Sequence, residues 1–178
     1  YSWPAPDSSE SAAFLWRTDV DTLASQVQWA AGSNLGEADL TTTSTGASFL
    51  FGGIADLGEN RIHELHLCGD LSPSTTYSYR VGGAGNWSDI YEFTTPGEPG
   101  TFDTFRVGIA GDSRGAYDVW AAVLANMDEA DVDFVMFSGD MVQLGINQDE
   151  WDAWWGATGD IAARLAIVPA HGNHEFLA

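Results

Sequence analysis

The sequence contains no lysine, and six arginines are its only basic residues against 26 aspartates and glutamates. The resulting net charge of −20 repels nucleic-acid phosphates, which argues against a DNA- or RNA-binding protein. We interpret this acidity as a solubility adaptation to a saline or extracellular setting. We prefer this interpretation to a surface made for one particular cationic partner.

Cysteine and long apolar runs are also scarce. The single cysteine, Cys68, excludes an intrachain disulfide, and its strand-like surroundings predict a small core residue. No apolar run approaches the length of a membrane span, and no signal peptide is recognisable. Because the chain begins with Tyr1 instead of methionine, we expect that an upstream segment has been removed. We predict an extracellular or periplasmic location.

The composition does support folded domains, with 44% hydrophobic residues and eight tryptophans in 178 residues. A short stretch rich in proline and glycine, residues 96–100, divides the chain into two unlike halves. We therefore predict an antiparallel β domain at 1–96, a linker at 97–103, and an α/β domain beginning at 104 and incomplete at 178.

The first half contains β-rich segments separated by turn residues, which is typical of a small antiparallel sandwich. Tyr77 and Tyr79, preceded by Leu71 and Pro73, resemble the tyrosine-corner region of a fibronectin type III domain. His63 and His66 are interpreted as ordinary strand residues without a ligand role. The predicted strands are 13–18, 25–30, 47–51, 61–67, 75–82 and 89–95.

The second half alternates strand-like and helical segments, an order that predicts one parallel sheet. The unbroken apolar run at 134–137 is typical of a strand buried on both faces. We place Val119, Leu124 and Met127 near one face of the first helix and expect the second helix to break at Gly156 or Gly159. The predicted strands are 105–110, 134–137 and 166–170, and the predicted helices are 116–130 and 147–165.

Each of these three strands ends at a glycine next to an oxygen donor. The donors are Asp112, Asp140 and Asn173, and the third is followed by His174. Taken singly, the aspartates suit helix caps or turns, Asn173 suits a turn, and His174 suits the surface. Because the carboxyl ends of parallel strands form the ligand-binding edge of such sheets, their convergence predicts a functional site.

Two carboxylates and an amide oxygen suit metal ions that accept oxygen ligands. The central carboxylate, that of Asp140, can bridge two ions. Without a cation, the Asp112 and Asp140 carboxylates would repel each other at this edge. Two bridged ions lower the pKa of a bound water and hold phosphate oxygens, so the pattern favours phosphoester chemistry.

The order and spacing of three motifs resemble the calcineurin-like metallophosphoesterases. These motifs are Gly111-Asp112, Gly139-Asp140 and Gly172-Asn173-His174-Glu175. The preceding fibronectin-like half makes the chain similar to the purple acid phosphatase-like branch. This resemblance implies a fold in which the second half is the first βαβαβ part of a metallophosphoesterase α/β sandwich.

The same resemblance implies a chemistry and a role for each residue. Asp112 would bind a first metal ion, Asp140 would bridge both ions and Asn173 would bind the second. His174 would contact the substrate phosphate or the leaving group. The reaction implied is hydrolysis of a phosphate monoester or diester by a metal-bound hydroxide, with iron, manganese or zinc as the metal.

Two residues depart from the family pattern. Gln143 stands where purple acid phosphatases have the tyrosine that colours their iron site, so we do not expect a ferric-tyrosinate centre. Arg114 stands where the branch has a small residue, and a guanidinium cannot bind a metal because it only donates hydrogen bonds. Arg114 is either a catalytic clamp on phosphate or a salt-bridge partner in this acidic protein.

The family's later histidine motifs have no counterpart up to Ala178. Three protein ligands fall short of the four to roughly six that such metals take. We therefore expect the site to need residues beyond Ala178, or the C-terminal remainder of the protein as a second chain. The alternative is a secreted, non-catalytic binding module on a degenerate phosphatase scaffold. Gln143 favours this alternative, and the intact Gly-Asn-His-Glu motif opposes it.

Overall fold

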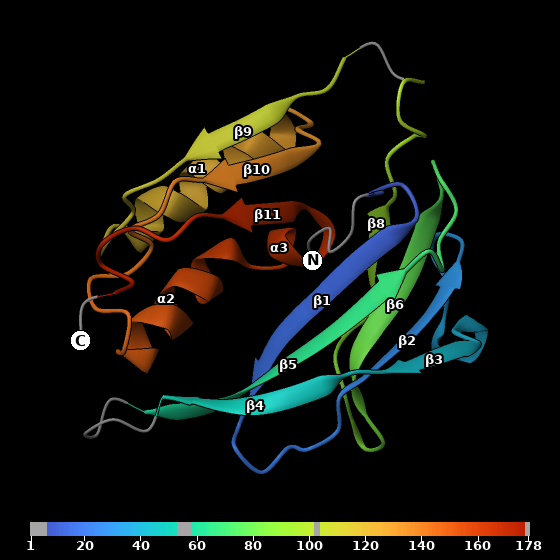
Figure 1. Ribbon diagram of the computed structural model, residues 1–178, viewed down its shortest axis with the longest axis horizontal. Coiled ribbons are helices and arrows are strands. Elements are labelled where there is room, and N and C mark those ends of the chain that lie inside the picture. The colour runs from blue at the N-terminus through green and yellow to red at the C-terminus, as the bar shows by residue number, and fades with distance from the viewer. Residues whose placement is uncertain (1–6, 53–57, 102–103, 177–178) are drawn as a thin grey trace. The chain divides into compact units, whose positions relative to one another are not determined.

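The computed structural model describes residues 7–52, 58–101 and 104–176, so residues 102–103 of the predicted linker and Ala178 lie outside it (Figure 1). The chain forms two compact units. The first comprises Tyr1–Leu50 and Arg61–Asp103, and the second comprises Phe51–Asn60 and Thr104–Ala178. The first unit is built from antiparallel strands, and the second contains a parallel sheet with helices.

Two sheets make up the first unit, with strand orders β1-β5-β4 and β3-β2-β6-β7, and β8 also pairs with β6. Strand β1 runs antiparallel to β5, and β2, β7 and β8 all run antiparallel to β6. The elements are β1 (Ser11–Thr18), β2 (Gln26–Ala31), the 3-10 turn η1 (Glu37–Asp39), β3 (Thr42–Thr45), β4 (Ala47–Gly52), β5 (Glu59–Cys68), β6 (Thr76–Gly83), β7 (Asn86–Trp87) and β8 (Tyr91–Thr94).

The core of the first unit is largely aromatic. Phe14 packs with its ring centroid 4.7 Å from that of Tyr79 and 5.7 Å from that of Phe93. The Tyr77 hydroxyl accepts a hydrogen bond of 2.8 Å from the backbone N–H of Ser72, in the segment predicted to form a tyrosine corner. Inward-facing residues from both sheets therefore close around one apolar layer, as in a sandwich.

The prediction that Cys68 lies in the core is wrong, because its side chain is exposed. Side chains alternate between the two faces of a strand. Leu65 and Leu67 of β5 are 3% exposed and face the core, so His66 and Cys68 face the other side. The alternation of side chains along β5, and not the apolar character of the segment, decides which face this cysteine occupies.

His63 is the most deeply buried ionisable residue of β5. It is fully buried, its Nδ1 and Nε2 atoms lie 2.8 Å from the hydroxyls of Ser25 and Thr18, and its ring stacks on Trp16. Burial lowers the pKa of the imidazole below its ordinary value of 6.5, and the positive charge of Arg61 lowers it further. His63 therefore serves as a neutral polar bridge in the core.

We expect the free energy of unfolding to fall as the pH is lowered below about 6.5. The unfolded chain takes up a proton at His63 near that pH, whereas the folded chain takes it up only at a lower pH. The loss levels off once the pH is below the folded-state pKa. Proton NMR of the imidazole gives this pKa directly, and a value of 6.5 or more would contradict the prediction. The His63→Gln variant should show a smaller slope of stability against pH in the same range.

In the second unit, strand and helix alternate and the sheet is parallel, as predicted. The structure gives its strand order as β11-β10-β9. Gly159, with a φ of 51°, stands directly after α2 at one of the two glycines where the break was expected. The elements are β9 (Val107–Ala110), α1 (Tyr117–Glu129), β10 (Phe134–Phe137), α2 (Gln148–Thr158), α3 (Ile161–Arg164) and β11 (Ala166–Pro169).

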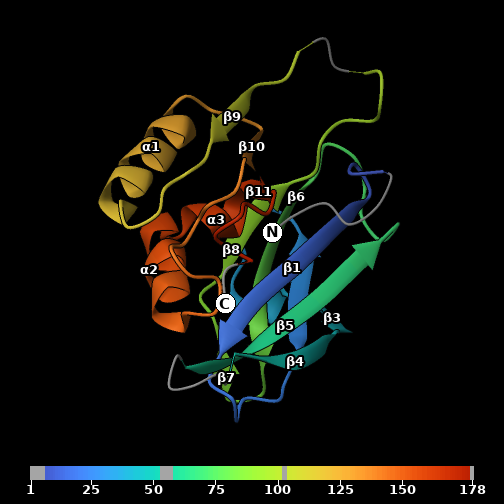
Figure 2. The same ribbon diagram turned by 60° about the vertical axis from the view of Figure 1, so that its left-hand side comes forward.

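Helices α1 and α2 cover one face of this sheet (Figure 2). Trp154 of α2 is fully buried, lies 5.5 Å from Trp120 of α1 between ring centroids, and meets Phe137 of β10 edge to face at 5.4 Å. Val135, Leu124 and Ile167 complete the contact between the sheet and the helices. This core fixes β10, from which the central loop of the candidate site emerges.

The prediction that 134–137 is buried on both faces is wrong. Val135 and Phe137 face the helices, whereas Met136 is 48% exposed. Its neighbours in register, Ile109 of β9 and Val168 of β11, are 72% and 38% exposed. The other face of the sheet is therefore an apolar surface left open within the described residues.

The predicted face of α1 also needs correction, because Val119 is 57% exposed and Trp120 is buried. Val119 and Leu124 are five positions apart in sequence, which places them about 140° apart around a helix of 3.6 residues per turn. Trp120, Leu124 and Met127 follow the i, i+4, i+7 spacing that keeps residues on one face. Trp120 and Leu124 belong to the buried core of the second unit, and Met127 is partly buried and packs against it.

Candidate metal centre

The loops that follow β9, β10 and β11 meet at one edge of the sheet, where all three strand arrows point (Figure 1). Backbone hydrogen bonds continue the ladder beyond the strands: Ser138 donates to Ala110 at 2.8 Å, and Asp112 donates to Gly139 at 2.9 Å. On the other side, Ala170 donates to Phe137 at 2.7 Å. The first two loops therefore run side by side through Asp112 and Gly139, with Asp140 next along the chain.

Both aspartates adopt a backbone conformation that residues other than glycine rarely take. The φ angle is 56° at Asp112 and 58° at Asp140, in the left-handed region. Such a residue costs of the order of 1–3 kcal/mol, and aspartate tolerates the conformation better than most residues. Asp131 shares the conformation outside the site, with a φ of 56°, so strain alone does not mark a ligand. At this edge, however, the left-handed conformation occurs at both aspartates, in the loops that follow the neighbouring strands β9 and β10.

Glycine is required where the second and third loops touch. Gly139 has a φ of 98°, and a Cβ atom there would lie 2.4 Å from the backbone nitrogen of Gly172. At Gly172, a Cβ atom would lie 2.0 Å from Oδ1 of Asp140. Any side chain at either position would push the loops apart. The glycines of the motifs thus permit the close approach of the Asp140 and Asn173 loops.

Arg114 lies among the predicted site residues. Its Nε atom is 2.7 Å from Oδ1 of Asp112, and its Nη1 atom is 3.9 Å from Oδ2 of Asp140 and in contact with Nε2 of His174. The Arg114 side chain is 28% exposed and that of Asp140 is 17% exposed. One positive charge therefore lies between two carboxylates and reduces the repulsion between them. Of the two roles considered for Arg114, the salt bridge is the one that this structure contains.

His174 joins the second loop to the third. Its backbone N–H donates to Oδ1 of Asp140 at 3.1 Å, and its Nδ1 atom lies 2.8 Å from the carbonyl oxygen of Gln143. Because a carbonyl only accepts hydrogen bonds, Nδ1 carries the proton and Nε2 presents its lone pair to Arg114. The tautomer is thus fixed by the Gln143 backbone.

Asn173 precedes His174 in the third loop and is exposed. In the described part of the chain, no three side chains of histidine, cysteine, aspartate or glutamate gather in a metal-binding cluster. The structure therefore brings together Asp112, Asp140, Arg114 and His174. It places Asn173 on the same edge, between two residues that approach Asp140.

Glu175 is the last residue of the third motif, and the sequence predicted no role for it. Its Oε2 atom accepts hydrogen bonds from the backbone N–H groups of Asp140 and Gly172 at 2.8 and 2.7 Å. Its Oε1 atom accepts from Met141 and Val142 at 2.7 and 3.3 Å. Burial raises the pKa of the Glu175 carboxyl, but these backbone donors outweigh it, and the pKa lies below its ordinary value. The carboxylate is held in its ionised form.

Ser113 is a second residue that the sequence did not single out. Its hydroxyl donates to the carbonyl oxygen of Met141 at 3.3 Å and accepts from the indole N–H of Trp154 at 3.0 Å. Ser113 therefore joins the Asp112 loop to the Asp140 loop and to α2. Both missed residues act through backbone groups far away in sequence, and only their position next to a motif aspartate or histidine could have suggested them.

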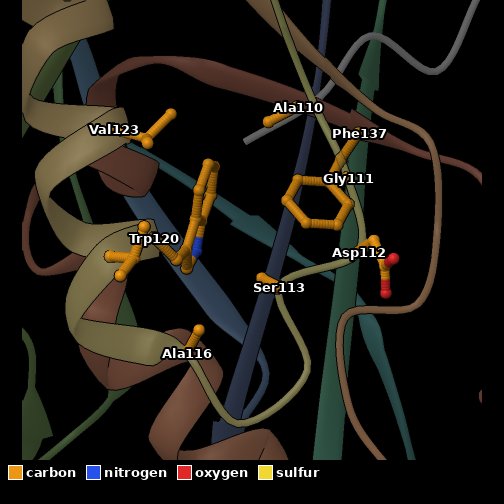
Figure 3. A pocket seen from close by; sticks show the side chains of 9 residues that line it. Ala110, Gly111, Asp112, Ser113, Ala116, Trp120, Val123 and Phe137 are labelled. Carbon is orange, nitrogen blue, oxygen red and sulfur yellow. The ribbon is translucent and has the colours of Figure 1, made fainter.

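A small hollow lies beside Asp112 between β9 and α1 (Figure 3). Its walls are mainly apolar and include Trp120 and Phe137, whose rings meet edge to face with centroids 4.9 Å apart, and the Asp112 carboxylate points away from it. This hollow therefore does not offer the charged surroundings that a phosphate group needs. The candidate centre is on the other side of Asp112, toward Arg114 and Asp140.

The sequence matches the models of two protein families. Residues 105–178 match the model of the calcineurin-like phosphoesterases, and residues 2–95 match that of the purple acid phosphatase N-terminal domain. The latter match covers more than half of the chain. The chain belongs to the purple acid phosphatase family within the calcineurin-like phosphoesterases. No helix in the described residues is long and apolar enough to cross a membrane.

Individual relatives support this placement. Purple acid phosphatase 22 of Arabidopsis thaliana is 32% identical over 116 residues, which are 65% of this chain and 25% of the relative. Purple acid phosphatase 21 of the same plant is 28% identical over 161 residues, which are 90% of this chain and 34% of the relative. The chain thus spans between a quarter and about a third of these curated relatives.

Solved structures confirm the fold. The purple acid phosphatase PPD1 from yellow lupin seeds superimposes with a TM-score of 0.72 at 20% identity, over 96% of this chain and 34% of that one. PhoD superimposes with a TM-score of 0.63 at 15% identity, over 95% of this chain and 37% of that one. The β domain followed by a parallel α/β sheet is therefore the architecture that the sequence predicted.

Proposed function

We propose that this chain is part of a metal-dependent phosphoester hydrolase with two metal ions at the carboxyl edge of its parallel sheet. The observation that carries the proposal is the convergence of Asp112 and Asp140, both in left-handed conformations, on one shared positive charge. Asp112 would hold the first ion and Asn173 the second. Asp140 would bridge both, because it lies in the loop that follows the central strand and is contacted from both neighbouring loops.

The residues present fit such a centre in part. Two carboxylates and one amide supply the oxygen atoms that iron, manganese and zinc accept. Four to roughly six ligands complete such shells, so further groups must come from a C-terminal remainder or a second chain. The open apolar surface at Ile109, Met136 and Val168 offers that remainder a face to pack on.

The metal ions, when bound, supply a hydroxide at neutral pH and neutralise phosphate charge. Around them, Arg114 is placed to exchange the Asp112 carboxylate for two phosphate oxygens, which match the fork of a guanidinium. His174 presents Nε2 to the same space, since Nδ1 is held by the Gln143 carbonyl. That nitrogen is placed to hold a proton for the leaving-group oxygen.

The proposal includes the organisation of the whole polypeptide. Residues 1–96 form a sandwich domain, 97–103 a linker, and 104–178 the first part of the catalytic domain. The protein acts outside the cytoplasm. Its substrate is a phosphate monoester or diester, and the loops that surround the centre decide between the two. A secreted binding module is the second candidate. It is favoured by Gln143, which replaces the family's tyrosine, and by a relative, 29% identical over 124 residues, named probable inactive purple acid phosphatase 24.

Removal of metal tests the proposal. Chelation of the complete protein should lower the hydrolysis of p-nitrophenyl phosphate by roughly a thousandfold or more, because no hydroxide is then formed at neutral pH. Addition of manganese, zinc or iron should restore it, and bis-p-nitrophenyl phosphate reports diesterase activity. Hydrolysis that survives chelation contradicts the metal mechanism. A folded protein that neither binds metal nor hydrolyses either ester supports the binding module instead.

A further inference from the structure

We propose that Glu175 is a positioning residue whose carboxylate fixes the Asp140 loop to the Asn173 loop. The inference deepens the proposed function, because the relative placement of these loops decides whether Asp140 and Asn173 can share a metal centre. Glu175 would not itself be a ligand. Both of its oxygen atoms are already used by backbone donors, with two hydrogen bonds to each.

The need for such a residue arises where β10 ends. Beyond Phe137 the chain turns through Gly139 and Asp140, both with positive φ, so the next N–H groups point away from the sheet ladder. Met141 and Val142 are 3% and 0% exposed, and a buried N–H without a partner costs about 1–3 kcal/mol. The Glu175 carboxylate satisfies three consecutive N–H groups of this turn, and charged acceptors form the stronger bonds.

The fourth bond makes Glu175 a link between loops. Its Oε2 atom accepts from Asp140 and Gly172 together, so a single atom joins the residue that would bridge the metals to the residue before Asn173. Two further contacts flank it: Gly145 donates to the His174 carbonyl at 3.0 Å, and His174 donates to the Asp140 carboxylate at 3.1 Å. Both of these hydrogen bonds join His174 to the segment that begins with the turn at Asp140.

The Glu175→Gln variant of the 178-residue chain tests the inference. It keeps the size of the side chain but places an amide NH₂ against backbone N–H donors, so hydrogen bonds are lost on one side. Amide hydrogen exchange by NMR should show at least roughly tenfold lower protection at residues 140–142 and 172, and unchanged protection at 134–137. Affinity for Mn²⁺, followed by line broadening at the same residues, should fall about tenfold, as for other outer-shell changes.

Glu150→Gln is the matched control. Glu150 also accepts backbone N–H groups, those of Gln143 and Leu144, but touches neither Asp140 nor Gly172. Its variant should lose protection at 143 and 144 and retain Mn²⁺ affinity. If Glu175→Gln does not fold, Glu175→Asp replaces it, with the same local loss of protection expected because the shorter side chain cannot reach both loops.

Three results would overturn the inference: unchanged exchange at 140–142 and 172, a uniform loss across the sheet and helices, or local loss with full Mn²⁺ affinity. The first result would mean that Glu175 does not hold these backbone N–H groups. The second would mean that Glu175 stabilises the fold in general. The third would mean that the placement of the loops does not affect metal binding. If the wild-type 178-residue chain does not broaden with Mn²⁺, the affinity measurement is made on the complete protein, where failure to bind Mn²⁺ counts against the proposed function instead. In that case the exchange pattern still decides the role of Glu175.

Discussion

Replacement of Asp140 by alanine is expected to remove both bound metal and phosphoester hydrolysis from the complete protein. Asp140 is the central and least exposed of the two carboxylates, with 17% of its side chain exposed. Its oxygens already meet one cation, the Arg114 guanidinium at 3.9 Å, and one hydrogen-bond donor, the His174 N–H at 3.1 Å. Because the carboxylate proposed to bridge would belong to both ions, its loss should lower kcat by roughly a thousandfold or more.

Two further variants isolate the cause. Asp131→Ala places alanine at a φ of 56°, against 58° at Asp140, and so reproduces the backbone strain without touching the site. His174→Ala should retain metal while turnover falls by about 10²- to 10⁴-fold. Metal content by mass spectrometry and kcat on an aryl phosphate separate the three. Full activity in Asp140→Ala would refute the role assigned to Asp140. Loss of metal in His174→Ala would refute the role assigned to His174.

Local sequence patterns predicted the fold of the second unit well, because its elements are fixed by short-range rules. The apolar run at 134–137 coincides with β10, and Gly159 follows α2. Two strands of the first unit were missed for the opposite reason. Thr42–Thr45 carries no apolar residue and Asn86–Trp87 has only two residues, so each is a strand only through its partner.

The errors have physical causes of the same kind. Cys68 was assigned to the core from its strand-like surroundings, whereas the alternation of β5 turns it outward. Met136 was expected to be buried because the run around it is apolar, but burial on the second face depends on what packs there. Burial is a property of the assembled layers, and a single strand does not reveal which of its faces is covered.

Part of the candidate site was likewise predictable from the sequence, and part was not. Glycine followed by aspartate at consecutive strand ends was enough to predict that Asp112 and Asp140 lie at one edge, since parallel strands share a direction. The contacts that organise the edge join groups far apart in sequence. Arg114 meets His174, and Glu175 meets the backbone of Asp140, Met141 and Val142. Such bonds depend on main-chain direction after the turn, which residue types alone do not determine.

The second large effect is expected from Trp154→Ala, which should lower the free energy of unfolding of the second unit by about 3–5 kcal/mol. Trp154 is fully buried and packs against Trp120 and Phe137, with its indole N–H bonded to the Ser113 hydroxyl. Alanine leaves a cavity between α1, α2 and β10. Because small domains are stable by only about 5–15 kcal/mol, this unit should approach unfolding.

Trp155→Ala is the matched control, since Trp155 is the next residue of α2 and is 41% exposed. Its cost should stay below about 1 kcal/mol, as for most surface changes. Trp154→Phe keeps most of the ring and loses the bond to Ser113, so it should cost less in stability than alanine while loosening the Asp112 loop. Urea denaturation followed by circular dichroism measures all three. Equal losses at Trp154 and Trp155 would mean that the helix, and not the buried ring, supports the sheet from which the candidate centre emerges.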